Sequence, residues 1–322
     1  MKLVNFEVEG KTCLGAVKGD LIANVSVAID MVAERQIIRF PGGTPRSKAR
    51  HVFLTTGPIP ESMNQLLGLD ELRRRALDQV LDGVVEHFRG DLEYDRLFTA
   101  LAAAKLLAPI PHPGKIICVG RNYAEHARER GSEIPTQPIF FLKSNNTICG
   151  PGDAIVIPPT SQQVDYEAEF AVVIGKGGKN IPEESAYGHV AGYMIMNDVS
   201  ARDMQSADKQ WFRGKSCDTF APIGPWIVTK DEIPDPHSLC ISLTLNGQTM
   251  QDSNTGNMIF RIPFLISYLS CSMTLEPGDI ISTGTPEGVG ASRTPPVFLK
   301  PGDVVSITVD KIGTLTNPVA AP

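Results

Sequence analysis

The sequence lacks paired cysteines, a long apolar run and an excess of positive charge. Its six cysteines are scattered without CxxC pairs, which argues against a disulfide framework and against a zinc site made of thiolates. No run of about 18 apolar residues occurs, and the opening MKLVNFEVEG reaches Glu7 and Glu9 before any apolar stretch. A formal net charge of -6 disfavours a phosphate backbone as a partner. We therefore expect an intracellular protein, in the cytoplasm or an organelle, without nucleic-acid or membrane partners.

The chain is long enough for one large domain and a smaller one. It has 322 residues, of which 42% are hydrophobic and 20% are charged, an ordinary globular composition. The segment PIPHPGK at 109–115 contains three prolines within five positions and cannot continue a helix. We place the domain boundary there. A small α/β domain is expected over 1–108, and a mainly β catalytic domain over 109–322.

Periodicity distinguishes these two regions. Residues 1–24 alternate apolar and polar in short runs separated by glycine, which predicts a small antiparallel sheet. Two later segments favour helices. They are DELRRRALDQVLDGV, with Leu72, Ala76, Val80 and Val84 on one face, and LFTALAAAKLL at 97–107. Beyond residue 115, three Pro-Gly-Asp triplets, at 151–153, 277–279 and 301–303, predict type II turns that each introduce a strand.

Three carboxylates form the first candidate site. In DYEAEFAVVIG, the period of two along a strand puts Glu167 and Glu169 on one face, about 7 Å apart at Cβ. A solvated strand edge explains that pair equally simply. Asp198, at the end of the apolar run VAGYMIMN, supplies a third acid. Three carboxylates without a nearby histidine or cysteine make a hard oxygen site that suits Mg²⁺, Mn²⁺ or Ca²⁺ and leaves positions open for a substrate.

A second candidate is a histidine and a glutamate on one helix face. In VGRNYAEHARERG, Glu129 follows His126 by three residues, so the carboxylate can orient the imidazole as a general base. A surface ion pair is the plainer interpretation of such a pair. In the charged segment after Asp198, Arg202, Gln205 and Lys215 are candidate donors to an anionic substrate.

Six segments, taken in order, resemble the fumarylacetoacetate hydrolase superfamily from about residue 109 to the end. They are GRNYAEHARE, PIFFLKSNNTICGPGD, DYEAEFAVVIG, AGYMIMNDVSARDMQ, GKSCDTFAPIGPWIVT and STGTPEGVG. WFRGKSCDTFAPIGPWIVT and TPPVFLKPGD resemble the branch of acylpyruvate hydrolases and oxaloacetate decarboxylases or tautomerases. The resemblance implies a mixed β-sheet roll, usually paired as a homodimer. Departures from it lie mainly in the first 108 residues, which vary across the family, and the basic stretch RFPGGTPRSKAR at 39–50 matches no part of it.

The resemblance also implies roles for individual residues. Glu167, Glu169 and Asp198 would carry Mg²⁺ or Mn²⁺, with Ca²⁺ as a structural substitute. His126 and Glu129 would form a catalytic dyad on a lid, with Lys215 as a further catalytic group. The substrate-holding groups would be Arg121, Lys143, Arg202, Gln205, Lys215 and Thr285.

The expected activity is a metal-dependent hydrolysis of a C–C bond in an acylpyruvate, a small 2,4-dioxo acid. In it, His126 takes a proton from water that attacks the distal carbonyl, and a pyruvate enolate departs. Oxaloacetate decarboxylation and keto-enol tautomerisation pass through the same kind of enolate and are the alternative. A metabolite-binding protein without turnover is a further alternative, because fold alone does not settle function.

Overall fold

The computed structural model of this chain describes residues 1–34, 57–88 and 96–322. These residues divide by mutual contact into two compact units, Met1–Leu107 and Ala108–Pro322. The basic stretch at 39–50 lies outside the described residues. Among the described residues, no helix is both long enough and apolar enough to cross a membrane.

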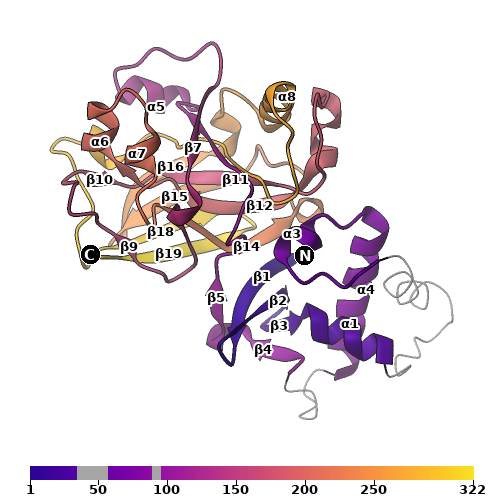
Figure 1. The fold of residues 1–322 in the computed structure, drawn as a ribbon. Helices are drawn as coiled ribbons and strands as arrows, with labels where there is room; N and C mark the ends of the chain where they lie inside the picture. The colour runs from indigo at the N-terminus through magenta and orange to yellow at the C-terminus, as the bar shows by residue number, and fades with distance from the viewer. Residues whose placement is uncertain (35–56, 89–95) are drawn as a thin grey trace. The chain divides into compact units, whose positions relative to one another are not determined.

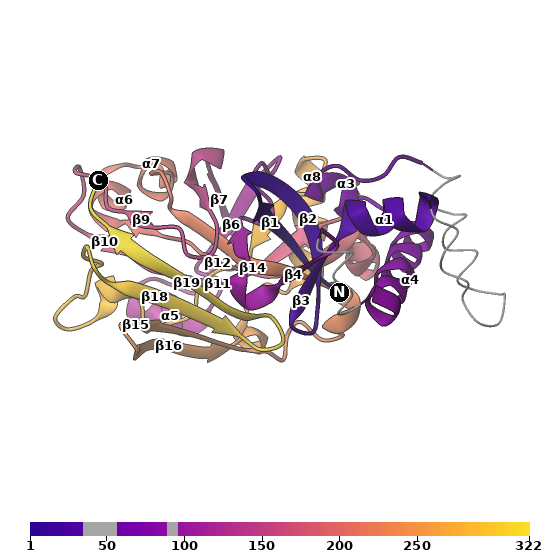
Figure 2. The same ribbon diagram turned by 90° about the horizontal axis from the view of Figure 1, so that it is seen from below.

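The N-terminal unit contains an antiparallel sheet with strand order β4-β3-β2-β1-β5 (Figure 1). Its strands are β1 (Lys2–Val8), β2 (Lys11–Lys18), β3 (Leu21–Asn24), β4 (Phe98–Ala100) and β5 (Lys105–Leu107). Its helices are α1 (Val25–Glu34), α3 (Met63–Leu67) and α4 (Glu71–Phe88). Helices α1 and α4 lie side by side (Figure 2). The sheet predicted over residues 1–24 is confirmed.

Two details of the helical predictions for this unit are wrong. On α4, Ala76, Val80 and Val84 are buried as predicted, but Leu72, at the first turn, is 59% exposed. The segment 97–107 forms β4, a short 3₁₀ turn and β5 instead of a helix. Pairing of β4 with β3 and of β5 with β1 explains the second error, because ladder hydrogen bonds to distant strands override a helical preference.

The C-terminal unit is built on a mixed sheet that carries the site residues. Its strand order is β14-β12-β11-β17-β6-β7, with β17 parallel to β6 and the other neighbours antiparallel. The strands are β6 (Ile116–Gly120), β7 (Ile139–Lys143), β11 (Ala168–Ile174), β12 (Val190–Asn197), β14 (Ala221–Thr229) and β17 (Ile280–Ser282). Strand β8 (Ile148–Cys149) runs parallel to β14. Every residue of β11 and β12 is buried, so these two strands lie in the core.

A second sheet has the strand order β16-β15-β18-β19-β9, and β10 pairs with β13 separately. These strands are β9 (Ile155–Val156), β10 (Val164–Asp165), β13 (Ser200–Ala201), β15 (Cys240–Leu245), β16 (Gln248–Asn254), β18 (Val304–Val309) and β19 (Gly313–Ala320). The helices of this unit are α5 (Ala124–Glu129), α6 (Arg202–Ala207), α7 (Phe212–Lys215) and α8 (Ile262–Ser272). One apolar cluster contains residues of both larger sheets, including Phe170 of β11 and Ile307 of β18. The predicted mainly β fold with mixed sheets is confirmed.

The three Pro-Gly-Asp triplets form the predicted turns. Gly152, Gly278 and Gly302 have φ angles of 80°, 87° and 94°, a left-handed conformation that favours glycine. Each turn is followed within a few residues by a strand, namely β9, β17 or β18. In each triplet a carboxylate oxygen of the aspartate accepts a hydrogen bond from the backbone N–H three residues earlier.

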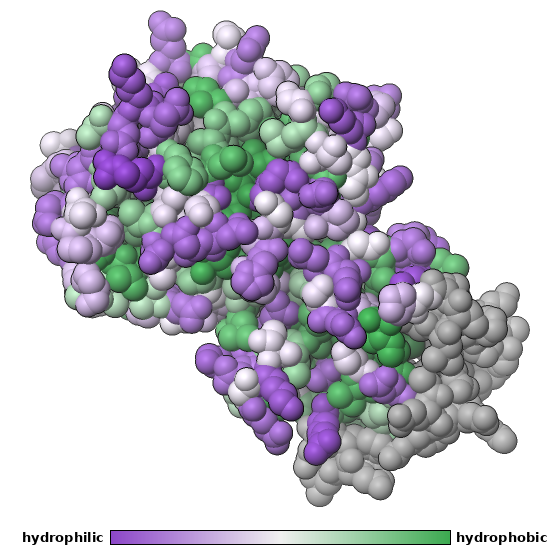
Figure 3. All heavy atoms as spheres, in the orientation of Figure 1, coloured by the Kyte–Doolittle hydropathy of each residue, from purple (hydrophilic) through white to green (hydrophobic). Residues whose placement is uncertain are grey.

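Hydrophobic side chains also gather on part of the surface. Figure 3 shows them on the C-terminal unit in the region of β7 and α8, where a shallow hollow is lined by Phe140, Leu142, Tyr268 and Met273. Leu142 and Tyr268 are 49% and 39% exposed. Strand β7 is an edge of the mixed sheet, so both its backbone and its apolar side chains are open on this side.

Candidate active site

Two neighbouring strands bring the three carboxylates together. Glu169 is the second residue of β11, Glu167 directly precedes that strand, and Asp198 directly follows β12. Because β11 and β12 are antiparallel, the start of one lies beside the end of the other, and the Asp198 N–H donates a 2.9 Å hydrogen bond to the Glu167 carbonyl. One carboxylate oxygen from each residue lies within 4.8 Å of the other two.

Burial decides between the two interpretations of the glutamate pair. Glu167, Glu169 and Asp198 are 4%, 1% and 0% exposed. A solvated strand edge is therefore excluded, and the three side chains form a buried acidic group. We call it the carboxylate trio.

The carboxylate trio fits a divalent cation. Its donors are carboxylate oxygens alone, the kind of ligand that Mg²⁺ and Mn²⁺ prefer. Burial, followed by repulsion from Asp198 and Glu167, raises the pKa of Glu169 well above its usual range. The Ser282 hydroxyl and the Gly284 N–H donate to one Glu169 oxygen at 2.5 and 2.9 Å without removing that repulsion. A cation between the three groups would relieve it.

Two buried lysines offset part of this negative charge. Lys215 Nζ lies 2.7 Å from both Glu167 Oε2 and Asp198 Oδ2, and Lys143 Nζ lies 2.6 Å from Asp198 Oδ1. Burial lowers the pKa of Lys215, but attraction to Asp198 and Glu167 outweighs it, and the net shift is upward. Both lysines are 2–3% exposed, so the ion pairs are held inside the protein.

Arg202 links the carboxylate trio to a fourth buried acid. Its guanidinium lies 2.6 Å from Glu167 Oε1 and 2.9 Å from Asp165 Oδ2, and it also donates to the Gln205 side chain at 3.1 Å. Burial opposes ionisation of Glu167, but Lys215 and Arg202 outweigh it and hold the pKa of Glu167 well below its usual range. Asp165 also accepts hydrogen bonds from the N–H groups of Gly290 and Ala291. Arg202 is therefore fixed from two sides.

The His126–Glu129 pair lies on α5 as predicted. His126 Nδ1 is 2.7 Å from Glu129 Oε1, and the second oxygen, Oε2, accepts a 2.8 Å hydrogen bond from the Gly288 N–H. Since a carboxylate only accepts, Nδ1 carries a proton, and Nε2 is the nitrogen that has the lone pair when the ring is neutral. His126 is 6% exposed, which excludes a solvated surface ion pair. The contact with Glu129 thus fixes the orientation of the imidazole.

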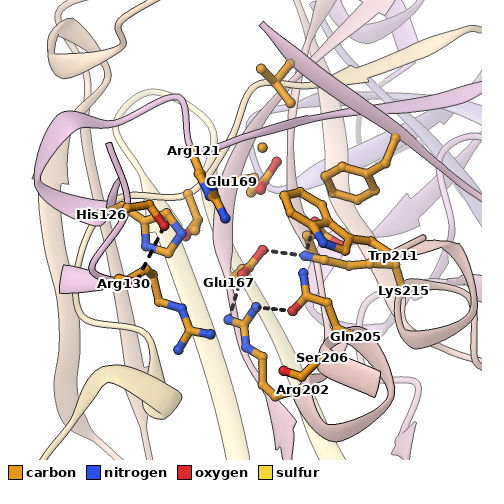
Figure 4. A pocket seen from close by; sticks show the side chains of 16 residues that line it. Arg121, His126, Arg130, Glu167, Glu169, Arg202, Gln205, Ser206, Trp211 and Lys215 are labelled. Carbon is orange, nitrogen blue, oxygen red and sulfur yellow. Dashed lines mark hydrogen bonds and ion pairs between the residues drawn. The ribbon is translucent and has the colours of Figure 1, made fainter. Parts of the chain in front are cut away.

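These groups line one cavity of about 190 Å³ (Figure 4). The sequence-predicted residues on its wall are Arg121, His126, Glu167, Glu169, Asp198, Arg202, Gln205, Lys215 and Thr285. Two further predicted residues lie behind the wall: Lys143 contacts Asp198, and Glu129 contacts His126. In Figure 4, Arg121, His126 and Arg130 lie on one side of the glutamates and Arg202, Gln205 and Lys215 on the other.

Sequence reasoning missed three residues of the wall that have aromatic or charged side chains. Phe141 and Trp211 form an apolar side, with ring centroids 5.4 Å apart, and the Arg121 guanidinium lies 5.7 Å from the Trp211 ring. Nothing in the sequence marks that aromatic pair. Arg130 also lines the cavity. Its position four residues after His126 is a usable signal, because residues four apart share a helix face.

Comparison with known proteins gives the family. A model of the fumarylacetoacetate (FAA) hydrolase C-terminal region matches residues 115–320. "Oxaloacetate tautomerase FAHD2A, mitochondrial" of Homo sapiens is 49% identical over 294 residues, which cover 85% of this chain and 94% of the relative. The corresponding Xenopus laevis protein, also named mitochondrial, is 48% identical over 249 residues, which cover 77% of this chain and 78% of the relative.

Solved structures agree with that match. A fumarylacetoacetate hydrolase from Exiguobacterium antarcticum is 33% identical, with a TM-score of 0.76 and full coverage of both chains. Maleylpyruvate hydrolase from Sphingobium sp. SYK-6, in complex with manganese (II) ion and pyruvate, is 29% identical, with a TM-score of 0.73 and coverage of 100% of this chain and 99% of the other. The chain therefore belongs to the fumarylacetoacetate hydrolase family.

Proposed function

We propose that this protein is an enzyme that interconverts the keto and enol forms of oxaloacetate. The observation that carries the proposal is the 49% identity over 294 residues to a human protein named as an oxaloacetate tautomerase. The hydrolase interpretation expected from the sequence becomes the second candidate. It is supported by the maleylpyruvate hydrolase of Sphingobium, at a lower identity of 29%.

The metal would be Mg²⁺ or Mn²⁺ on Glu167, Glu169 and Asp198. When bound, it would neutralise the negative charge that develops on the 2-oxo oxygen as an enolate forms. The manganese named for the Sphingobium structure supports this choice of ion. The raised pKa of Glu169 supports it independently, because burial and repulsion from Asp198 and Glu167 persist there although lysines offset part of the charge of the trio.

The chain's own residues supply the proton transfer. Keto-enol interconversion moves a proton between C3 and the 2-oxo oxygen and needs neither an attacking water nor a leaving group. His126 Nε2 can take that proton and return it, because Nδ1 is fixed as a donor to Glu129. Lys215, on the opposite side in Figure 4, would donate to the oxygen that gains charge.

Cavity size favours a short substrate. Ligand cavities usually measure roughly 300 to 1,000 Å³, and this one measures about 190 Å³. A four-carbon acid therefore suits it better than a long acylpyruvate. A purely metabolite-binding role leaves the His126–Glu129 dyad without a purpose.

The test is a substrate panel with Mg²⁺ and with Mn²⁺. Oxaloacetate, acetylpyruvate and fumarylpyruvate would be assayed for loss of enol absorbance, for pyruvate and for CO₂. We expect oxaloacetate tautomerisation to exceed every cleavage and decarboxylation rate. A higher rate of acylpyruvate cleavage would replace the proposal with the hydrolase.

A variant of the base tests the mechanism. Since a positioned general base contributes about 10²- to 10⁴-fold to a rate, His126→Ala should lower kcat for oxaloacetate tautomerisation by that amount. His112→Ala, a change at an exposed histidine outside the cavity, is the control and should keep the wild-type rate. An unchanged rate in His126→Ala would remove His126 from the mechanism.

Location is part of the proposal. The relatives named mitochondrial support an organelle for this chain, in place of the cytoplasm. Fractionation of cells that express the full-length protein would distinguish the two compartments.

A further inference from the structure

The cationic side chains of the cavity divide into two groups. Arg202 and Lys215 are each held by carboxylates within 2.6–2.9 Å. Arg121 and Arg130 differ from them, since among the described residues neither guanidinium has an ion pair or a side-chain hydrogen bond. Arg121 instead lies over the Trp211 ring. Arg130 lacks such a ring contact in the part of the chain that the structure describes. Of the positively charged side chains on the wall, it therefore has the fewest interactions within the protein.

Arg130 lies where a second anionic group of a substrate would arrive. It caps the C-terminal end of α5, directly after Glu129, and its side chain is exposed at the wall of the cavity. Its guanidinium lies on the same side as His126 and faces the side that carries Arg202 (Figure 4). Partial burial, followed by repulsion from Arg202, lowers the pKa of Arg130. An anion between the two guanidinium groups would relieve that repulsion.

We propose that Arg130 binds the second carboxylate of a 2-oxo dicarboxylic acid and sets a preference for such acids over their uncharged counterparts. The inference rests on the proposed function, because the 2-oxo acid end must lie at the carboxylate trio for the other end to reach Arg130. A guanidinium matches a carboxylate with two parallel hydrogen bonds, which makes arginine selective for that group. A neutral acyl group at the same place leaves the guanidinium without a partner.

The position of Arg130 at the end of α5 means that a carboxylate bound to it would also be placed relative to His126. Residues four apart share a helix face, so Arg130 and His126 approach the same substrate from one helix. A carboxylate held by Arg130 would place C3 of a four-carbon acid between that anchor and the trio, beside the His126 ring. Arg130 is thus a specificity-determining residue and His126 the base.

The experiment compares Arg130→Gln with Arg128→Gln. Both variants remove one positive charge from an exposed side chain at the end of α5, but Arg128 pairs with Glu125 and does not line the cavity. Each variant, and Arg130→Lys, would be assayed with oxaloacetate and with its 4-methyl ester, which lacks the second charge. We expect Arg130→Gln to lower kcat/KM for oxaloacetate by about 10- to 100-fold, mainly through KM, because a charged hydrogen-bonded pair is lost.

In Arg130→Gln, kcat/KM for the ester should change less than about threefold. Arg130→Lys should recover part of the loss for oxaloacetate, because lysine keeps the charge but cannot form the two parallel hydrogen bonds of a guanidinium. Arg128→Gln should match the wild type on both substrates. Equal losses on acid and ester, or no loss on either, would overturn the proposal.

A binding measurement separates this inference from the tautomerase proposal. With Mn²⁺ present, calorimetry would compare oxalate, which is too short to reach Arg130, with 3,3-difluorooxaloacetate, which cannot enolise. Arg130→Gln should weaken the difluoro acid alone. If the wild type binds that acid but does not tautomerise oxaloacetate, only the tautomerase proposal fails. If the wild type does not bind it, or if oxalate weakens equally in the variant, the role of Arg130 fails.

Discussion

Each unit of the chain holds a lysine between two carboxylates, and these two lysines lie in different surroundings. In the N-terminal unit, Lys18 pairs with Asp78 and Asp82, whose side chains are 46% and 58% exposed. In the C-terminal unit, Lys215 pairs with Asp198, and these side chains are 2% and 0% exposed. The N–O distances, 2.7 to 2.9 Å, are the same in both units.

Ion pairs with equal N–O distances contribute differently to the free energy of unfolding when their burial differs. An exposed pair contributes about 0 to 1 kcal/mol to stability, because water and salt screen it. A buried pair must first offset a desolvation penalty of several kcal/mol per ion, so a buried pair is weak evidence of a stabilising role. The buried ion pairs around the cavity are therefore better explained by the chemistry of the cavity than by stability.

Removal of Arg202 should give the largest effect. Arg202→Met leaves Glu167 and Asp165 without their shared guanidinium in a buried place. We expect the free energy of unfolding to fall by about 3 to 5 kcal/mol, the usual cost of leaving a buried charge unpaired. Urea denaturation of the metal-free protein measures it.

The matched change in the other unit is Arg75→Met. Arg75 and Glu71 are 77% and 62% exposed and lie one helical turn apart. The expected loss is below about 0.5 kcal/mol. If the two variants lost similar stability, the contrast between the units would be false.

Removal of one carboxylate from the trio should have an intermediate effect, visible only with metal. Because the pKa of Glu169 is already raised, Glu169→Gln should leave the metal-free protein equally stable or more stable. With Mn²⁺ at one hundred times the wild-type Kd, the wild type should gain about 2.7 kcal/mol and the variant almost nothing. Thermal melts with and without Mn²⁺ measure the difference. An equal gain in both proteins would exclude Glu169 as a ligand.

An effect smaller than those at Arg202 and Glu169 should come from Lys18. Burial lowers the pKa of Lys18, but Asp82 and Asp78 raise it further, so the net shift is upward. Its contribution is therefore complete below the unfolded pKa of about 10.4 and is lost as pH rises through the folded value. Lys18→Met should cost about 1 kcal/mol at pH 7 and less near pH 11. A loss that grew with pH would contradict this assignment.

Sequence patterns within a few residues predicted much of the backbone structure. The prediction failed where a segment pairs with strands that are distant in the sequence. The turns at Gly152, Gly278 and Gly302 follow from residue chemistry within four positions, and the structure has all three. The segment 97–107 was misjudged because its partners, β1 and β3, lie far earlier in the sequence. A short stretch of sequence around 97–107 does not include β1 or β3, so periodicity within it cannot reveal this pairing.

The same limit applies to the site. The period of two placed Glu167 and Glu169 on one face, but it could not distinguish burial from solvation. That distinction depends on Lys215, 48 positions from Glu167, and on Lys143, 55 positions from Asp198. Carboxylates can be buried in the ionised form only when cations on other elements offset their desolvation penalty.

One carboxylate joins two tasks that many enzymes keep apart. Glu129 orients His126 with one oxygen and holds the Gly288 N–H with the other. Gly288 has a φ of 100°, and an added Cβ there would lie 2.2 Å from the Met250 carbonyl oxygen, so the loop has little freedom to follow α5. Because these two bonds use the two oxygens of one carboxylate, the position of the Gly288 loop also sets the orientation of the imidazole.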